Sequence, residues 1–495
     1  MTDQKEAPLL DAIEAFHREN RLSFTIPGHK QGAGADADLR RVLGEEAFAA
    51  DICVIGGLDD RRATKGIESS AGKLAASAWD AEEAQLSTNG SSLSVQAALM
   101  SIAGPRDRLL VARNMHMSGV NGLVLSGIEP IFVAPEMDED LEIAHTVTPE
   151  AAEAAFAANP DARGLIIVSP TYYGVTADVA RLADVCHRHD VPLIVDQAWG
   201  PHFAFHPELP EHASTAGADL VVMSVHKTLG AFAEASIILR RRSLVDAERL
   251  TLAVTLLEST SASSIILGSL DGARREMVRD GRRRLGETLR LVRAARQRLA
   301  KIDGIEVMGR EVVGRPGAFD LDETKLVFDV RGLGITGFTA SDWLYEECGI
   351  AIELADHRRL MAVVTIGDTE ASIGRLVGGM RELATWAADH RQPEAERSIP
   401  PVRKLLTESV MRPRDAFFGP VRRIPLAEAK GEIAAETVAP YPPGIPVLSP
   451  GDRITPTLVA YLEGGVRQGM YVEAGDSSMQ TIRVVDGSSK RTKRR

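Results

Sequence analysis

The 495-residue chain has few cysteines and no long apolar run. Its three cysteines, Cys53, Cys186 and Cys348, are far apart and odd in number, which excludes a disulfide framework and a CxxC metal site and favours a reducing cytosol. No apolar segment approaches the ~20 residues that span a bilayer. The acidic, amphipathic start of the chain does not have the pattern of a secretory signal. We therefore expect a cytoplasmic protein that uses neither a membrane nor a metal.

The sequence also lacks the phosphate-binding motifs of the common nucleotide enzymes. There is no GxxxxGK[ST] and no GxGxxG after a strand, which disfavours a nucleoside triphosphate or a dinucleotide as ligand. Lys and Arg number 57 against 69 Asp and Glu, so the net charge is −12. That charge argues against nucleic acid as a partner and would attract a cationic small substrate, although acidity also serves solubility alone.

From about residue 80, apolar strand patterns alternate with helical ones, which predicts an α/β fold with a mostly parallel sheet. The strand candidates are 109–112, 131–134, 164–169, 191–195, 220–223 and 236–240. The last candidate follows its predecessor too closely for a helical crossover, so we expect it to run antiparallel. A long helix over about 267–302 then leads away from this sheet.

Composition and pattern predict five parts in the chain. A short N-terminal helix and a wrapping segment (1–75) precede a large α/β domain (76–304) and a smaller α+β domain (305–390). A C-terminal α+β domain follows over 401–475. The last part, 476–495, ends in a basic, Ser-rich tail that we expect to be disordered.

Two polar residues follow apolar runs that read as buried parallel strands. Asp196 closes the run 191–195, and Lys227 comes shortly after the run 220–223. Because ligands in open α/β sheets bind outside the carboxyl ends of the strands, both side chains are expected at one site. Lys227 would bind an aldehyde as an imine, and Asp196 would keep a ring nitrogen protonated. The pair is the minimum for pyridoxal phosphate (PLP) chemistry, whereas each residue alone is also typical of a cap or a solvated charge.

Two further segments would complete a PLP site. Thr88-Asn89-Gly90-Ser91-Ser92 precedes a helical run, so its glycine and serines can hold a phosphate at the helix N-terminus, with ordinary helix capping as the alternative. His116 follows the strand candidate 109–112 and is placed to stack on a flat ring, although a lone histidine is commonly a surface or capping residue. Ser224 and His226, beside Lys227, would also reach the phosphate.

Over roughly residues 5 to 475, the chain resembles the Orn/Lys/Arg decarboxylases, PLP enzymes of the aspartate-aminotransferase fold. The matching words are FTIPGHKQG (24–32), GLDD (57–60), TNGSS (88–92), RNMHMSGVNGLVLSG (113–127), SPTYYGV (169–175), DQAWGPHFAFHPELP (196–210), SVHKTLGA (224–231), ELAD (353–356), TIGDT (365–369) and YPPGIPVLSPGD (441–452). Their number and order make the resemblance specific. It implies a PLP-transferase large domain with a smaller α+β domain and a C-terminal α+β domain, assembled as a homodimer or a higher homo-oligomer.

The resemblance also implies a role for each matching residue. The residues implied in phosphate contact are Gly90, Ser91, Ser92, Ser224 and His226. His116 would stack on the ring, and Asp196 and Ala198 would lie on its other sides. Lys227 would form the imine, and either Lys227 or His226 would return a proton to Cα.

The implied reaction is α-decarboxylation of lysine, ornithine or arginine to a di- or polyamine and CO₂, a step of polyamine biosynthesis and amino acid metabolism. Glu353 and Asp356 are candidates for binding the distal cation of the substrate, or else surface carboxylates at a strand end. The alternatives are an aminotransferase or aldolase of the same fold, and a non-catalytic sensor or scaffold. Departures from the commonest family pattern, which leave the amino acid open, are Arg61-Arg62, Met117, Gln197, Trp199 and Glu234.

Overall fold

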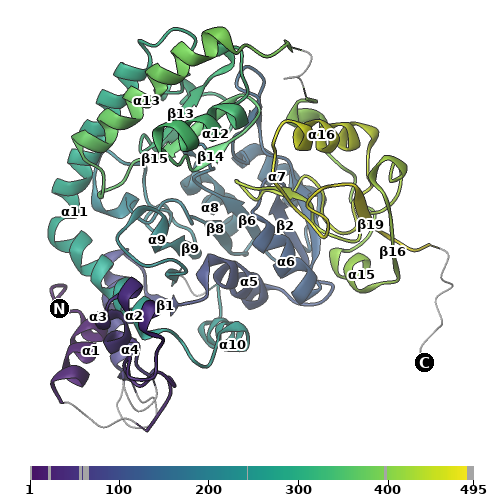
Figure 1. Cartoon of the computed structure of the whole chain (residues 1–495). Coiled ribbons are helices and arrows are strands. Elements are labelled where there is room, and N and C mark those ends of the chain that lie inside the picture. Colours follow the sequence, from purple (N-terminus) through teal and green to yellow (C-terminus); the bar gives the residue numbers. More distant parts are fainter. Residues whose placement is uncertain are drawn as a thin grey trace. The chain divides into compact units, whose positions relative to one another are not determined.

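The computed structural model describes residues 3–19, 24–54, 58–59, 66–241, 244–394 and 399–487 (Figure 1). The chain forms two compact units. Unit 1 contains Met1–Ile102 and Cys186–Gly286, and unit 2 contains Ala103–Val185 and Glu287–Arg495. Stretches of the expected large domain, 76–304, therefore fall in both units. The fold is α/β with a mainly parallel central sheet, which confirms the predicted fold class.

Unit 1 contains four strands in the order β1-β10-β9-β8, where β1 is Glu83–Ser87, β10 Ser236–Arg240, β9 Leu220–Ser224 and β8 Leu193–Asp196. The strands β8 and β9 are parallel, and their register sets Asp196 opposite Val222. Strand β10 runs antiparallel to both β9 and β1, as its short connection predicts. Strand β1 was not predicted, because the alternating segment Glu-Ala-Gln-Leu-Ser is short and contains neither a β-branched nor an aromatic residue.

The helices of unit 1 are α1 (Pro8–Arg18), α2 (Ala37–Leu43), α3 (Glu45–Ala50), α4 (Ile67–Ala78), α5 (Gly90–Ile102), the short α9 (Val225–Thr228) and α10 (Ala247–Leu257). Helix α5 packs against β9, β10 and α10. It buries small and apolar side chains over most of its surface, including Val95, Ala98 and Leu99, and a helix enclosed in this way has little freedom to shift. Helices α8 (Val179–Arg188) and α11 (Ser264–Leu299) each continue from one unit into the other.

In unit 2, β2 (Arg108–Ala112) pairs in parallel with β6 (Leu165–Val168) and with β3 (Glu129–Val133). Helices α6 (Met117–Ser126) and α7 (Pro149–Ala158) follow β2 and precede β6. Short antiparallel pairs join β4 (Met137–Asp138) to β5 (Ile143–Ala144) and β7 (Val175–Thr176) to β12 (Asp320–Leu321).

A second sheet in unit 2 has the order β11-β13-β15-β14. Its strands are Glu306–Val307, Lys325–Asp329, Arg359–Val363 and Leu354–Ala355, in that order. Helices α12 (Gly337–Cys348) and α13 (Glu370–Asp389) belong to the same body, and their apolar faces share one core with β13 and with the C-terminal end of α11 (Figure 1). The four strands, α12 and α13 lie within residues 305–390, and we refer to them as the small α+β domain.

The C-terminal part contains α15 (Pro413–Phe418), β16 (Val421–Pro425), β17 (Ala439–Pro440), α16 (Pro456–Arg467), β18 (Val472–Glu473) and β19 (Thr481–Val485). These elements, drawn in yellow-green to yellow in Figure 1, enclose a core of their own. The prediction of disorder from 476 onward is wrong for β19, which pairs with all five residues of β16 and buries Ile482 and Val484. The apolar-polar alternation of Thr-Ile-Arg-Val-Val is the signal that predicts this strand. Residues 488–495 lie outside the described residues.

Among the residues that the structure describes, no helix is both long and apolar enough to cross a membrane.

A buried histidine in unit 1 makes the fold sensitive to acid. The side chain of His212 is buried, its Nδ1 accepts a hydrogen bond from the N–H of Ser214 at 3.2 Å, and its Nε2 lies 3.3 Å from the sulfur of Met223. Burial, with a smaller contribution from the nearby His202, lowers the pKa of His212 to about 3. The folded protein therefore keeps this imidazole neutral well below its ordinary pKa of 6.5.

We expect His212 to add a defined pH dependence to stability. Below pH 6.5 the unfolded chain binds a proton at His212 that the folded chain does not, so the free energy of unfolding falls as the pH drops, by up to about 1.4 kcal/mol per pH unit from this group. His212→Asn, which retains an acceptor for Ser214, should have a flatter profile between about pH 6 and pH 4. Urea unfolding over that range is the measurement, and equal slopes in both proteins would contradict the assignment.

Candidate active site

Lys227 and Asp196 both lie at the carboxyl edge of the unit 1 strands. Asp196 is the last residue of β8, while β9 ends at Ser224 and continues directly into α9, which carries Lys227. Because the two strands are parallel neighbours, their ends meet at one edge. Trp199 lies beside Lys227: its ring centroid is 4.5 Å from Lys227 Nζ, a distance at which an ammonium group is attracted to the face of an indole.

The carboxylate of Asp196 is almost enclosed, with 6% of the residue exposed. Its Oδ1 accepts a hydrogen bond from the N–H of Ala198 at 3.2 Å. Burial raises the pKa of Asp196, and the Lys227 charge and the Ala198 N–H oppose this without cancelling it. A buried carboxylate with an excess desolvation cost is stabilised by a cationic N–H partner. Asp196 therefore suits a protonated ring nitrogen.

A cradle for an anion lies at the start of α5. The hydroxyl of Ser224 donates to Ser91 Oγ at 2.7 Å, so two hydroxyls from different elements meet there. Gly90 has a φ of +71°, its N–H donates to the carbonyl of Glu234 at 2.9 Å, and a Cβ at this position would meet no atom within 4 Å. Ser92 is the third residue of the helix. Open space beside N-terminal N–H groups and hydroxyls fits a phosphate.

The imidazole of His226 has a defined tautomer in its neutral form. Nδ1 lies 3.0 Å from the carbonyl oxygen of Ala235, which accepts only, so Nδ1 carries the proton. Burial lowers the pKa of His226, and the Lys227 charge lowers it further, against an opposing effect of the Ala235 hydrogen bond. Neutral His226 therefore has an unprotonated Nε2, and it can donate to a phosphate only after taking up a second proton.

Three departures from the family pattern have local structural roles. Gln197 is buried, and its Oε1 accepts a hydrogen bond from the N–H of Ala213 at 3.1 Å. Glu234 has a φ of +71° and supplies the carbonyl that binds the Gly90 N–H, while Trp199 packs against Lys227 as described above. Arg61 and Arg62 lie outside the described residues, as do Gly57 and Asp60 of the GLDD motif.

The other expected site residues belong to unit 2. His116 is the N-cap of α6 and accepts a hydrogen bond from the N–H of Ser118. Glu353 is exposed. Asp356 lines a cavity of about 180 Å³ together with the aromatic rings of Tyr173 and Tyr461.

Asp356 already has a cationic partner. Its Oδ2 accepts from the Tyr173 hydroxyl at 3.1 Å and lies 3.4 Å from Nε of Arg359. Burial by itself raises the pKa of Asp356, but the charges of Arg359 and His357 and two backbone N–H groups outweigh it, so the pKa lies below its ordinary value. A substrate cation at Asp356 would therefore compete with Arg359.

One buried ion pair of unit 2 was not predicted. Arg113, the residue after β2, binds Asp452, and it also donates to Thr407 Oγ1 at 2.7 Å and Ser449 Oγ at 3.2 Å. The side chain of Asp452 is fully buried. Both partners belong to motifs that match the family, RNMH and SPGD. No local pattern indicates that these two motifs, 339 residues apart in sequence, are in contact.

Comparison with known proteins identifies the family. The solved constitutive lysine decarboxylase of Escherichia coli has the same fold, with a TM-score of 0.81 over 98% of this chain and 82% of that one, at 21% identity. The chain therefore has an α/β fold of the PLP-transferase type. The sequence matches the Orn/Lys/Arg decarboxylase major domain over residues 7–372 and the family's C-terminal domain over 400–467.

The chain belongs to the Orn/Lys/Arg decarboxylase family, and is a decarboxylase. It is 39% identical to an arginine decarboxylase of Halalkalibacterium halodurans over 491 residues, which cover 98% of this chain and 99% of the relative. It is also 39% identical to an arginine decarboxylase of Bacillus subtilis over 487 residues, 97% and 98% of the two chains. The predicted family and the predicted enzyme class are confirmed. Within the described ranges, no group of three His, Cys, Asp or Glu side chains is arranged to hold a metal ion.

We expect Asp452→Asn to destabilise the protein strongly, because it leaves the Arg113 charge buried without its counter-charge. The free energy of unfolding should fall by about 3–5 kcal/mol, measured by urea unfolding. Glu150→Gln is the matched control, since it removes one partner of the exposed Arg181–Glu150 pair in the same unit and should change little. Equal small effects of both substitutions would show that the buried pair does not stabilise unit 2.

Proposed function

We propose that this decarboxylase releases CO₂ from arginine, with PLP as its cofactor, to give agmatine. The observation that carries the proposal is the buried Asp196 at the same strand edge as Lys227, beside the Ser91–Ser224 cradle. Arginine is the proposed substrate because the two named relatives, at 39% identity over nearly the whole chain, are arginine decarboxylases. The likeness to a lysine decarboxylase at 21% identity supports the fold alone.

The residues of unit 1 suit three parts of the cofactor. Gly90, Ser91, Ser92 and Ser224 would hold its phosphate. Asp196 would hold the ring nitrogen protonated, with Ala198 beside the ring, and Lys227 Nζ would bind the aldehyde carbon. When bound, PLP supplies the electron sink that a carbon needs as its carboxylate leaves. We further propose that His116 of unit 2 stacks on the ring.

Lys227 is the better candidate for the proton that replaces CO₂ on Cα. With substrate bound, its side chain would be a free amine, and as an ammonium group beside the Trp199 ring it would hold a transferable proton. Neutral His226 donates its only ring proton to Ala235, so its Nε2 has none to give. His226 would serve best by keeping Lys227 in position and by contacting the phosphate when protonated.

The remaining site residues and the biological setting follow as proposals. Glu353 and Asp356 would attract the guanidinium group of arginine, with Asp356 doing so in exchange for Arg359. A reaction that yields agmatine would supply polyamine biosynthesis. The three cysteines are unpaired, which suits the reducing cytoplasm.

We expect the purified protein with added PLP to show the absorbance band of a lysine-bound cofactor and to release CO₂ from arginine faster than from lysine or ornithine. Lys227→Ala should abolish both, because the attachment atom is lost. Asp196→Ala should lower turnover more than PLP binding, because the ring nitrogen loses its counter-charge. Absence of the band in the wild type would support the sensor or scaffold alternative, and a band with amino-group transfer instead of CO₂ release would support an aminotransferase.

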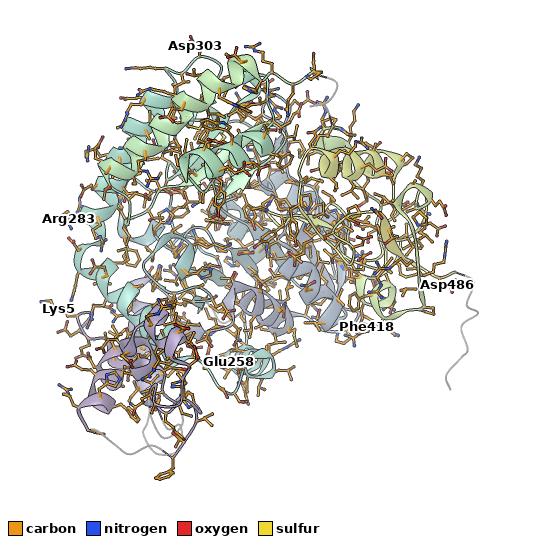
Figure 2. All side chains as sticks on the ribbon, viewed as in Figure 1. Lys5, Glu258, Arg283, Asp303, Phe418 and Asp486 are labelled. Atoms are coloured by element: carbon orange, nitrogen blue, oxygen red, sulfur yellow. The ribbon has the colours of Figure 1, made fainter. Side chains whose placement is uncertain are left out.

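We also propose that the protein is a homodimer through apolar side chains of unit 1. Helix α10 exposes Leu252 by 61% and Leu256 by 72%, and the N-terminal segment exposes Phe24 by 88%. Leu252 and Leu256 are four residues apart and so share one face of α10, where they form an apolar patch of the kind that marks an interaction surface. Figure 2 labels Glu258, the C-cap residue that follows α10.

Leu256→Glu should convert the dimer to a monomer, because the charge would be buried in the interface without a partner. Light scattering during gel filtration should show the mass of one chain for this variant and of two for the wild type. Tyr345→Glu on α12, which replaces an exposed aromatic residue of unit 2, should remain a dimer. A dimeric Leu256→Glu variant would contradict the proposed surface.

A further inference from the structure

The ring of His116 is held by its own helix. His116 is the N-cap of α6, and its Nδ1 accepts a hydrogen bond from the N–H of Ser118 at 3.1 Å and lies 2.8 Å from Ser118 Oγ. A nitrogen that accepts from a backbone N–H carries no proton, so the proton of this imidazole is on Nε2. The capping interaction fixes the Nδ1 side of the ring and leaves the Nε2 side to other contacts.

Gly444 of the C-terminal part lies against that second side. The turn from Pro440 to Gly444 is closed by a hydrogen bond from the Gly444 N–H to the Pro440 carbonyl at 2.8 Å. The Gly444 carbonyl accepts from the N–H of Met117, the first residue of α6, at 2.9 Å. A Cβ built on Gly444 would lie 3.0 Å from Nε2 of His116, 3.2 Å from its Cδ2 and 3.1 Å from Cδ2 of Tyr441, closer than ordinary contact. Only a glycine lets this backbone approach the imidazole edge so closely.

The C-terminal part also binds the segments on both sides of His116. On one side, Asp452 and Thr407 bind Arg113, three residues before His116. On the other, α15 packs against α6, and Arg414 donates to the Val124 carbonyl at 3.2 Å. His116 thus stands in a loop whose two ends and whose ring edge are all in contact with the C-terminal part.

We propose that Gly444 is a positioning residue for His116, through which the C-terminal part sets the plane of the imidazole that receives the PLP ring. The inference rests on the proposed function, since it gives His116 the stacking role. Gly444 touches neither reacting atom. It acts by closing the Nε2 side of the imidazole, so that the ring has one orientation before the cofactor arrives and loses little freedom on binding it.

The experiment compares Gly444→Ala with Gly431→Ala in the full-length protein. Both glycines lie in the C-terminal part with positive φ, +78° and +86°, so both variants carry the same kind of backbone strain. A Cβ at Gly431 meets no atom within 4 Å, whereas a Cβ at Gly444 meets His116. The cofactor-free proteins are first unfolded in urea, which measures the shared strain. The dissociation constant for PLP and the circular dichroism of the PLP band are then measured.

Gly444→Ala should weaken PLP binding about three- to tenfold more than Gly431→Ala, the range that the loss of one ring-stacking contact produces, and should alter the dichroism of the bound cofactor. In a His116→Ala background most of the difference in PLP binding between the two variants should disappear, because the methyl group then has no imidazole to displace and meets only the ring of Tyr441. If the wild type and Gly431→Ala bind PLP and release CO₂ while Gly444→Ala behaves as Gly431→Ala does, the positioning role is overturned and the proposed function stands. If the wild type itself does not bind PLP, both the positioning role and the proposed function are overturned.

Discussion

The parallel pairing of β8 with β9 is the constraint on which the site of unit 1 depends. It brings two residues that are 31 positions apart in sequence to one edge, with Asp196 at the end of one strand and Lys227 in the short helix that follows the other. A slip of this register would separate the carboxylate from the amine and would also move Ser224 away from Ser91. The enclosed apolar residues of β9 and α5 resist such a slip, because repacking them would open cavities.

Burial then gives these side chains their chemistry. Asp196 is costly to ionise where it lies, and a cationic ring nitrogen is the partner that relieves the cost. Burial also favours the neutral form of His226, whose Nδ1 donates its proton to the Ala235 carbonyl. Trp199 offers Lys227 a ring face in a place where water is scarce. An aspartate and a histidine on an exposed loop would titrate normally and would not distinguish a cofactor from solvent.

The C-terminal part of unit 2 contacts the segment that carries His116. Its core is separate from that of the small α+β domain, yet its turns contact the loop that carries His116, and its helix α15 packs against α6, which follows that loop. The buried pair Arg113–Asp452 gives this contact its strength, because neither charge has water to replace its partner. Gly444 allows its turn to approach the loop closely, because a side chain at that position would collide with the imidazole of His116.

The strand–helix alternation, the antiparallel β10 and the family could all be predicted from the sequence, as could the candidate residues Asp196, Lys227, His116 and Gly90. Each of these depends on a local pattern, since an apolar run, a short connection or a motif is visible within a few residues. Strand β1 was missed because its alternation is short and has no β-branched or aromatic residue, and strand β19 because its alternation lies next to a basic, Ser-rich tail. The folded chain was needed to see that Asp356 pairs with Arg359, that Arg113 meets Asp452, and that Gly444 touches His116. Those contacts join segments hundreds of residues apart or depend on burial, and neither distance in space nor exclusion of water is written in the local sequence.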